Sequence, residues 1–290
     1  MSAAPTCETR LARVALGDRE AFVAMYRDSA PRLFAVLLHL LGNRAEAEAT
    51  LPDLYVEIRA RAAHRRPGRG GAEAWLVALA REIALERRHR RPAGPEDALP
   101  PSVCAPRLDA CLRRLSPERA EALQRAWLWG ETPDQLSRRV AMPPGALCAR
   151  LRDDLTVLAA CLHGAPENAQ TARATAMAGA CLLGLLPVDE AELAEDRIAI
   201  DADFARLVDR WRTDLAQMVG GLDPVPPPPE VLAALDLRLF ADRDRPLWQR
   251  LGLVQAVLGA AAAAGILLLA LELGLLNDSP GQPPDSTRPP

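Results

Sequence analysis

The sequence predicts an all-α protein made of small helical domains, and three observations carry that prediction. Aromatic residues, which favour strands, make up only 4% of the 290 residues, whereas Ala, Leu and Arg dominate. Apolar residues recur at helical spacing, as at Trp75, Leu79 and Ile83. Capping residues such as Asp18 and Asn43 stand where helices should begin. A sheet-centred fold is therefore not expected.

The basic residues are unusual in kind and in distribution. All 35 of them are Arg, and the absence of Lys excludes Schiff-base chemistry and a P-loop lysine. The net charge is −3, yet residues 56–91 carry ten Arg against four Glu. A positive field of this size attracts a polyanion, and Arg can bind a phosphate through two hydrogen bonds. A solvated, charged helix end is the alternative explanation.

Cysteine and histidine are scattered along the chain. The six Cys stand at positions 7, 104, 111, 148, 161 and 181 without any C-x-x-C pair, and the four His are far apart in sequence. Isolated, reduced cysteines are therefore expected, with no metal site and no other cofactor. The sequence contains no recognisable nucleophile–His pair, glycine-rich phosphate loop or carboxylate pair. We therefore expect that the protein is not an enzyme.

Shifts in composition divide the chain into successive parts. The predicted order is a helical domain at 8–92, a Pro-rich linker at 93–107, a second helical domain at 108–163, a small acidic helical domain at 171–243, an apolar segment at 251–276 and a polar tail at 277–290. A run of prolines near the end of the acidic domain predicts a stiff, polyproline-type spacer.

The apolar segment 251–276 contains only two polar side chains, Gln255 and Glu272. As a helix it would be long enough to cross the hydrocarbon core of a membrane. Four Arg residues precede it within 238–250, and a single Arg follows it. The positive-inside rule therefore predicts a single-pass membrane protein with a cytoplasmic N-terminus and a disordered tail. A buried Ala-rich helix in a soluble core is the alternative.

The first helical domain carries a family resemblance. The stretch ALGDREAFVAMYRDSAPRLFAVLLHLLGNRAEAEA, followed by AWLVALAREIALERRHRR, resembles region two of the extracytoplasmic-function sigma factors of bacterial RNA polymerase over residues 10–92. The resemblance implies that the earlier helices contact the polymerase core and that the last helix recognises and opens the promoter −10 element. It implies polymerase contacts at Asp53, Leu54 and Tyr55, and DNA contacts at Arg81, Arg87, Arg88, Arg90 and Arg91.

The second helical domain contains a helix-turn-helix pattern. Ser116 and Pro117 open one helix, and a capping box from Thr132 to Gln135 opens the next. LSPERAEALQRAWLWGETPDQLSRRVAMPPGALCARLRDDLTVLAACL resembles region four of the same sigma factors, which binds the −35 element. The DNA-contact candidates are Arg138, Arg139, Arg150 and Arg152. A plain helical hairpin that packs on a partner is the alternative.

The third helical domain carries an amphipathic helix with Phe204, Leu207, Trp211 and Leu215 on one face. Its leucine-rich start, acidic helix opening, D-x-D-F turn, Trp-bearing helix and proline run resemble the cytoplasmic domain of RskA-type anti-sigma factors, over about residues 176–240. The resemblance implies an intramolecular anti-sigma contact through this face, between regions two and four. It also implies a transmembrane tether in the bacterial inner membrane.

Together these resemblances predict a membrane-tethered transcription initiation factor that binds promoter DNA and the RNA polymerase core. Its fused anti-sigma domain would hold it inactive until a partner or a protease releases it. Four departures from the family pattern, at Ala49, Pro52, Glu82 and Cys148, support an alternative. In that alternative the chain is a degenerate sigma-like membrane regulator, which sequesters transcription partners without initiating transcription.

Overall fold

Helices in the chain begin at the capping residues that the sequence predicts. The Asp18 carboxylate accepts a hydrogen bond of 3.0 Å from the first turn of its helix, and the Asn43 side chain accepts one of 3.1 Å from the amide of Glu46. Thr132 and Gln135 form the reciprocal capping box. Each cap satisfies an amide that the first helical turn leaves without an intrahelical partner. The predicted caps at Asp18, Asn43 and Thr132 are confirmed, whereas Ser116 precedes α6 as predicted but its hydroxyl makes no capping hydrogen bond.

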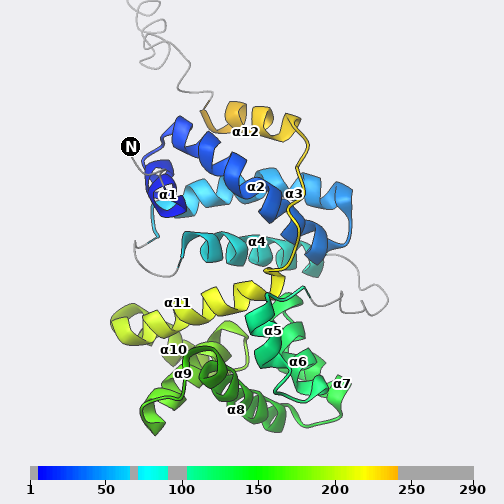
Figure 1. The fold of residues 1–290 in the computed structure, drawn as a ribbon, viewed down its shortest axis with the longest axis vertical. Helices are drawn as coiled ribbons and strands as arrows, with labels where there is room; N and C mark the ends of the chain where they lie inside the picture. The colour runs from blue at the N-terminus through cyan, green and yellow to red at the C-terminus, as the bar shows by residue number, and fades with distance from the viewer. Residues whose placement is uncertain (1–5, 66–70, 91–102, 241–290) are drawn as a thin grey trace, which may run out of the picture. The chain divides into compact units, whose positions relative to one another are not determined.

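The computed structural model describes residues 6–65, 71–90 and 103–240, in which every regular element is a helix (Figure 1). This confirms the predicted all-α class. The first module contains α1 (Cys7–Ala15), α2 (Arg19–Leu41), α3 (Arg44–Ala62) and α4 (Ala72–His89). The second module contains α5 (Pro106–Leu112), α6 (Pro117–Leu128), α7 (Pro133–Val140) and α8 (Pro144–His163). The third block contains α9 (Ala169–Leu182), α10 (Val188–Ile200), α11 (Ala202–Ala216) and the short η1 (Gln217–Val219), and α12 (Glu230–Phe240) follows it.

Residues 1–235 form one compact unit, and a second unit begins at Asp236. The three helical groups named above therefore belong to the same unit. Several predicted features lie outside the described residues: Arg91, most of the linker 93–107, the apolar segment 251–276 and the tail 277–290.

The core of the first module forms around aromatic side chains of α2 and α3. Phe22, Phe34 and Tyr55 are fully buried. The Tyr55 ring centroid lies 4.7 Å from that of Tyr26 and 5.9 Å from that of Phe22, which it meets edge-on. Burying one such side chain stabilises the fold by roughly 1.5–3 kcal/mol. Because α4 packs against α2 and α3, this core positions its Arg-rich C-terminal half.

α3 continues from Arg44 to Ala62 although Pro52 stands inside it. A proline within a helix cannot donate the hydrogen bond to the carbonyl four residues earlier. Leu51 and Leu54, on either side of Pro52, are fully buried, and their packing holds this part of α3 against the core. Tertiary packing therefore overrides the local disadvantage of the proline.

The second module and the third block share a continuous set of helix contacts. α8 packs against α5, α6 and α7, and it also packs against α9 (Figure 1). α9 packs in turn against α11, while α10 packs against both α9 and α11. α11 also packs against α4 of the first module. The third block thus has contacts with both of the preceding modules.

The proline-rich segment after η1 lies against the first module. Residues 222–228 form no regular element, as the prolines predict. The amide of Val225 donates a hydrogen bond of 2.9 Å to the carbonyl of Pro31 in α2. The predicted spacer is therefore also a point of attachment to α2.

The structure contradicts the prediction of a transmembrane helix, and with it the prediction of a single-pass inner-membrane location. No helix within residues 6–65, 71–90 and 103–240 is both long enough and apolar enough to cross a membrane. The longest of them, α2, has 23 residues but carries Arg27, Asp28 and Arg32 in its middle turns. Such charges are costly in hydrocarbon, so helix length alone does not make a span.

Candidate nucleic-acid interface and its intramolecular contacts

Arg81, the first of the predicted DNA-binding residues on α4, faces the second module. Its guanidinium donates hydrogen bonds to the carbonyls of Trp127 and Ala126, the second at 3.3 Å. The same group lies 5.2 Å from the centroid of the Trp127 ring. Burial lowers the pKa of Arg81 to about 10, because desolvation disfavours the charged form. In this conformation the guanidinium of Arg81 binds the C-terminal end of α6.

The remaining α4 arginines differ in their surroundings. Arg88 stacks at 3.5 Å from the centroid of the Trp129 ring and donates a 3.0 Å hydrogen bond to the carbonyl of Leu40. Arg87 forms an ion pair with Asp53 on α3. Arg90 pairs at 2.7 Å with Glu86, one turn away, and both side chains are largely exposed. Arg91 lies outside the described residues.

The three predicted polymerase contacts on α3 do not share one surface. Leu54 and Tyr55 are fully buried, so in this conformation they belong to the module core. The Tyr55 hydroxyl lies 2.7 Å from the hydroxyl of Ser29, and burial raises the pKa of Tyr55 well above its usual range. Only Asp53 reaches the surface, where Arg87 pairs with it.

The predicted DNA-binding residues of the second module lie mainly at its surface. Arg138 and Arg150 are exposed, as is the N-terminal part of α8 around Gly145. Arg139 pairs at 3.1 Å with Glu131. α7 and the start of α8 are joined by a short turn, and their Arg138 and Arg150 are more accessible than Arg81 and Arg88 of α4.

Arg152 is the exception among these arginines. It pairs at 3.0 Å with Glu190 of α10. This contact links the predicted recognition helix to the acidic part of the third block. The sequence did not predict this pair.

The predicted anti-sigma face on α11 is buried inside residues 1–235. Phe204, Trp211 and Leu215 are at most 2% exposed, and Leu207 is partly buried. The Trp211 indole donates a 2.8 Å hydrogen bond to the carbonyl of Thr175 on α9. This face therefore packs against other helices of the chain.

A small residue on α9 makes room for this tryptophan. A Cβ atom at Gly179 would meet the Trp211 ring at 2.9 Å and the side chain of Leu155 on α8 at 3.2 Å. Separations this short force neighbouring atoms to move, so α9 and α11 approach closely only because residue 179 is a glycine. Trp211 thus holds α11 to α9 within the third block, and α9 in turn packs against α8.

The end of the third block contacts the chain segment that leads into α5. The amide of Ala105 donates a 2.8 Å hydrogen bond to the carbonyl of Gln217, and the amide of Gly221 donates a 2.7 Å bond to the carbonyl of Val103. A Cβ atom at Gly221 would lie 2.8 Å from that same Val103 oxygen. The two backbones meet too closely for a side chain at this position.

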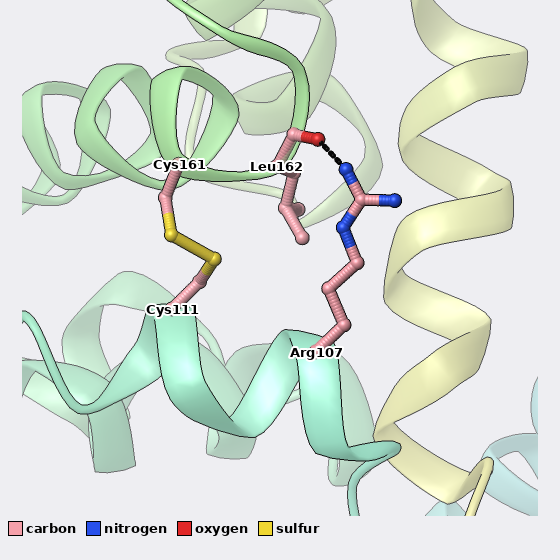
Figure 2. The surroundings of a disulfide bond; sticks show 4 residues. All are labelled: Arg107, Cys111, Cys161 and Leu162. Atoms are coloured by element: carbon pink, nitrogen blue, oxygen red, sulfur yellow. Dashed lines mark hydrogen bonds between the residues drawn. A yellow bond between two sulfur atoms is a disulfide. The ribbon is translucent and has the colours of Figure 1, made fainter.

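Two of the cysteines that were expected to be reduced are paired. Cys111 on α5 and Cys161 on α8 form a disulfide between residues 50 positions apart in sequence, and Figure 2 shows Arg107 reaching the Leu162 carbonyl beside it. The prediction of isolated thiols is therefore wrong for this pair. Sequence spacing carried no signal for it, because helix packing alone brings the two positions together.

Two residues after Cys161, a polar contact joins α8 to α11. His163 Nε2 lies 2.7 Å from Asp214 Oδ2. Burial raises the pKa of Asp214, while the neighbouring His163 opposes that shift. The end of α8 is thus held to α5 by the disulfide and to α11 by this pair.

Sequence reasoning found the arginines but missed the groups that cover them. Trp127 and Trp129 occur in a short WLWG run, whose aromatic content was the only available signal.

A scan against protein-family models and a search of curated proteins found nothing that matches this chain.

Proposed function

We propose that the chain is a sigma-like transcription initiation factor that carries its own inhibitory domain. Its two modules resemble regions two and four, and the third block resembles an anti-sigma domain. The observation that carries the proposal is the position of α11, which packs against α9 beside the second module and against α4 of the first. A helix placed in this way can restrain both modules at once.

The contacts of the third block support inhibition by docking. Trp211 holds α11 to α9, α9 packs against α8, and Arg152–Glu190 adds a charged contact at the predicted recognition helix. Gln217 and Gly221 hold the segment that leads into α5, which would restrict the separation of the two modules. Because the inhibitor is part of the same chain, its effective concentration is of the order of millimolar, and modest contacts suffice.

Binding to the RNA polymerase core tests this proposal. Immobilised full-length protein is incubated with purified bacterial core RNA polymerase, and the retained polymerase is measured. The Trp211→Ala variant should retain at least ten-fold more core than the wild type, because loss of the indole loosens α11 from α9 and so weakens its contact with α4. Leu193→Ala, on the exposed face of α10, is the matched control and should behave as the wild type.

A second variant disturbs a contact outside the α9–α11 core. Gly221→Ala introduces one methyl group against the Val103 carbonyl and should raise core retention in the same direction. Absence of core from every folded variant would contradict the sigma-like function.

A second candidate function is that of a regulator that sequesters transcription proteins without initiating transcription. The observation that favours it is Glu82, an acidic side chain exposed on α4 that pairs at 2.8 Å with Arg61. A carboxylate among DNA-facing arginines repels phosphate. Core retention without transcripts from a library of duplex DNA fragments would support this candidate and exclude initiation.

A further inference from the structure

The turn that ends α6 lies against one face of α4. Arg81, Leu85, Arg88 and His89 are spaced so that they share a face of that helix. Arg81 binds the carbonyls at the end of α6, and Arg88 stacks on Trp129. Between them, a Cβ atom at Gly130 would lie 3.1 Å from Leu85 and 3.7 Å from His89.

This turn offers the two α4 arginines the kinds of contact that a nucleic acid would offer. The last carbonyls of a helix have no intrahelical partners and lie at the negative end of its dipole, so they attract a guanidinium. The faces of tryptophan rings bind the same group by cation–π attraction. Single-stranded DNA likewise provides phosphate oxygens and stacked aromatic bases. Turn and DNA therefore compete for the same donors.

The third block meets α4 at a different place. A cavity of about 430 Å³ between α4 and α11 is lined by Ala72, Ala74 and Val77 from the N-terminal half of α4 and by Thr213 and Ala216 from α11. The α6 turn instead contacts the C-terminal half, from Arg81 onward. The two covers on α4 are therefore separate in space and come from different parts of the chain.

We propose that the turn Trp127–Gly130 is an intramolecular occupant of the α4 arginine face and closes it to single-stranded DNA independently of the third block. This inference rests on the proposed function, since it takes α4 as a DNA-binding helix. On this inference, α4 becomes accessible in two steps. Release of α11 exposes the N-terminal half of α4, and separation of the two modules frees Arg81 and Arg88.

Substitution of Trp129 tests this directly in the full-length protein. The Trp129 indole N–H is buried without a partner among the described residues, so Trp129→Leu removes the stack without removing one of the described hydrogen bonds. Affinity for a fluorescent 20-nucleotide single-stranded DNA of random sequence is measured by anisotropy. It should rise at least five-fold. Trp129→Phe keeps a ring with weaker cation–π attraction and should give an intermediate rise of about two-fold.

Trp75 provides a matched control. Arg65 lies over its ring at 5.9 Å, so Trp75→Leu also removes an arginine-stacked tryptophan, but one within the first module. Its DNA affinity should stay within two-fold of the wild type. A second readout is the rate at which phenylglyoxal modifies Arg88, relative to the exposed Arg90, followed by mass spectrometry. Trp129→Leu should raise that relative rate at least five-fold.

The outcomes distinguish failure of the inferred occupancy of α4 from failure of the proposed sigma-like function. Modification of Arg88 at the wild-type rate in Trp129→Leu overturns the inferred occupancy. DNA affinity that rises in Trp211→Ala but not in Trp129→Leu also overturns it, while leaving the proposed function in place. Faster modification of Arg88, combined with no DNA binding by any variant, contradicts the proposed function and the inferred competition together.

Discussion

The arginines of α4 and those of the helix-turn-helix carry the same charge but lie in different surroundings. Arg81 and Arg88 are covered by carbonyls and tryptophan rings of α6, whereas Arg138 and Arg150 are exposed. The difference teaches that net charge along the sequence does not measure the charge that a ligand can reach. Neither module is uniform in this respect, since Arg90 of the first is exposed and Arg152 of the second pairs with Glu190.

The largest expected effect concerns Trp211, which holds α11 to α9 within the third block. Trp211→Ala removes a buried indole and its hydrogen bond to Thr175, and should lower the free energy of unfolding by about 3–5 kcal/mol. Urea unfolding followed by circular dichroism measures this loss. Leu193→Ala, at an exposed position on α10, should change it by less than about 0.5 kcal/mol. Equal effects of the two substitutions would show that Trp211 is not an anchor.

The next largest effect is expected from the disulfide, which should stabilise the second module. Replacing both Cys111 and Cys161 by Ala opens a loop between positions 50 residues apart and should cost about 2–4 kcal/mol of stability. Lower urea midpoints would report this loss, with steeper slopes because the unfolded chain exposes more surface without the cross-link. Cys181→Ala, at a free thiol, is the control. A double variant as stable as the wild type would contradict the stabilising role of the cross-link.

A pH titration reports on the first module alone, because both tyrosines of the chain, Tyr26 and Tyr55, lie in it. Burial raises the pKa of Tyr26 to about 12. A folded-state pKa above the unfolded value means that the native state holds the proton more tightly. The contribution of Tyr26 to stability is therefore retained below pH 10 and is lost as the pH rises toward about 12, by about 2 kcal/mol for a shift of this size.

Absorbance at 295 nm measures tyrosine ionisation during this titration. Ionisation should coincide with unfolding of the first module, and Tyr26→Phe should weaken the pH dependence. Tyrosines that ionise near their ordinary pKa while the helices remain folded would contradict the buried arrangement.

The smallest expected effect on stability belongs to an exposed arginine of the helix-turn-helix. Arg150→Ala should change the free energy of unfolding by less than about 0.5 kcal/mol, since its side chain lies at the surface. If Arg150 contacts phosphate, the slope of log affinity for duplex DNA against log salt should fall by about one in this variant. An unchanged slope would remove Arg150 from the interface.

Local rules in the sequence predicted much of the fold. The caps at Asp18, Asn43 and Thr132 lie where expected, because a cap depends only on residues within one helical turn. The apolar face of α11 was also predicted, since helical periodicity identifies such a face without knowledge of its partner.

Features that depend on tertiary packing were not predictable in this way. Periodicity does not reveal which helix a face will meet, so the burial of Leu54 and the pairing of Cys111 with Cys161 came only from the structure. The same holds for Arg81, whose sequence neighbours indicate a solvated basic helix and whose actual neighbour is the end of α6.

Amide hydrogen exchange of α11, measured in the full-length protein with and without saturating RNA polymerase core, tests the central claim most directly. If the third block restrains the two modules, binding of the polymerase must displace it, because the coupling between two competing contacts is reciprocal. The amides of residues 202–216 should then exchange at least ten-fold faster when the core is bound. Unchanged protection of α11 in a protein that has bound the core would contradict the account.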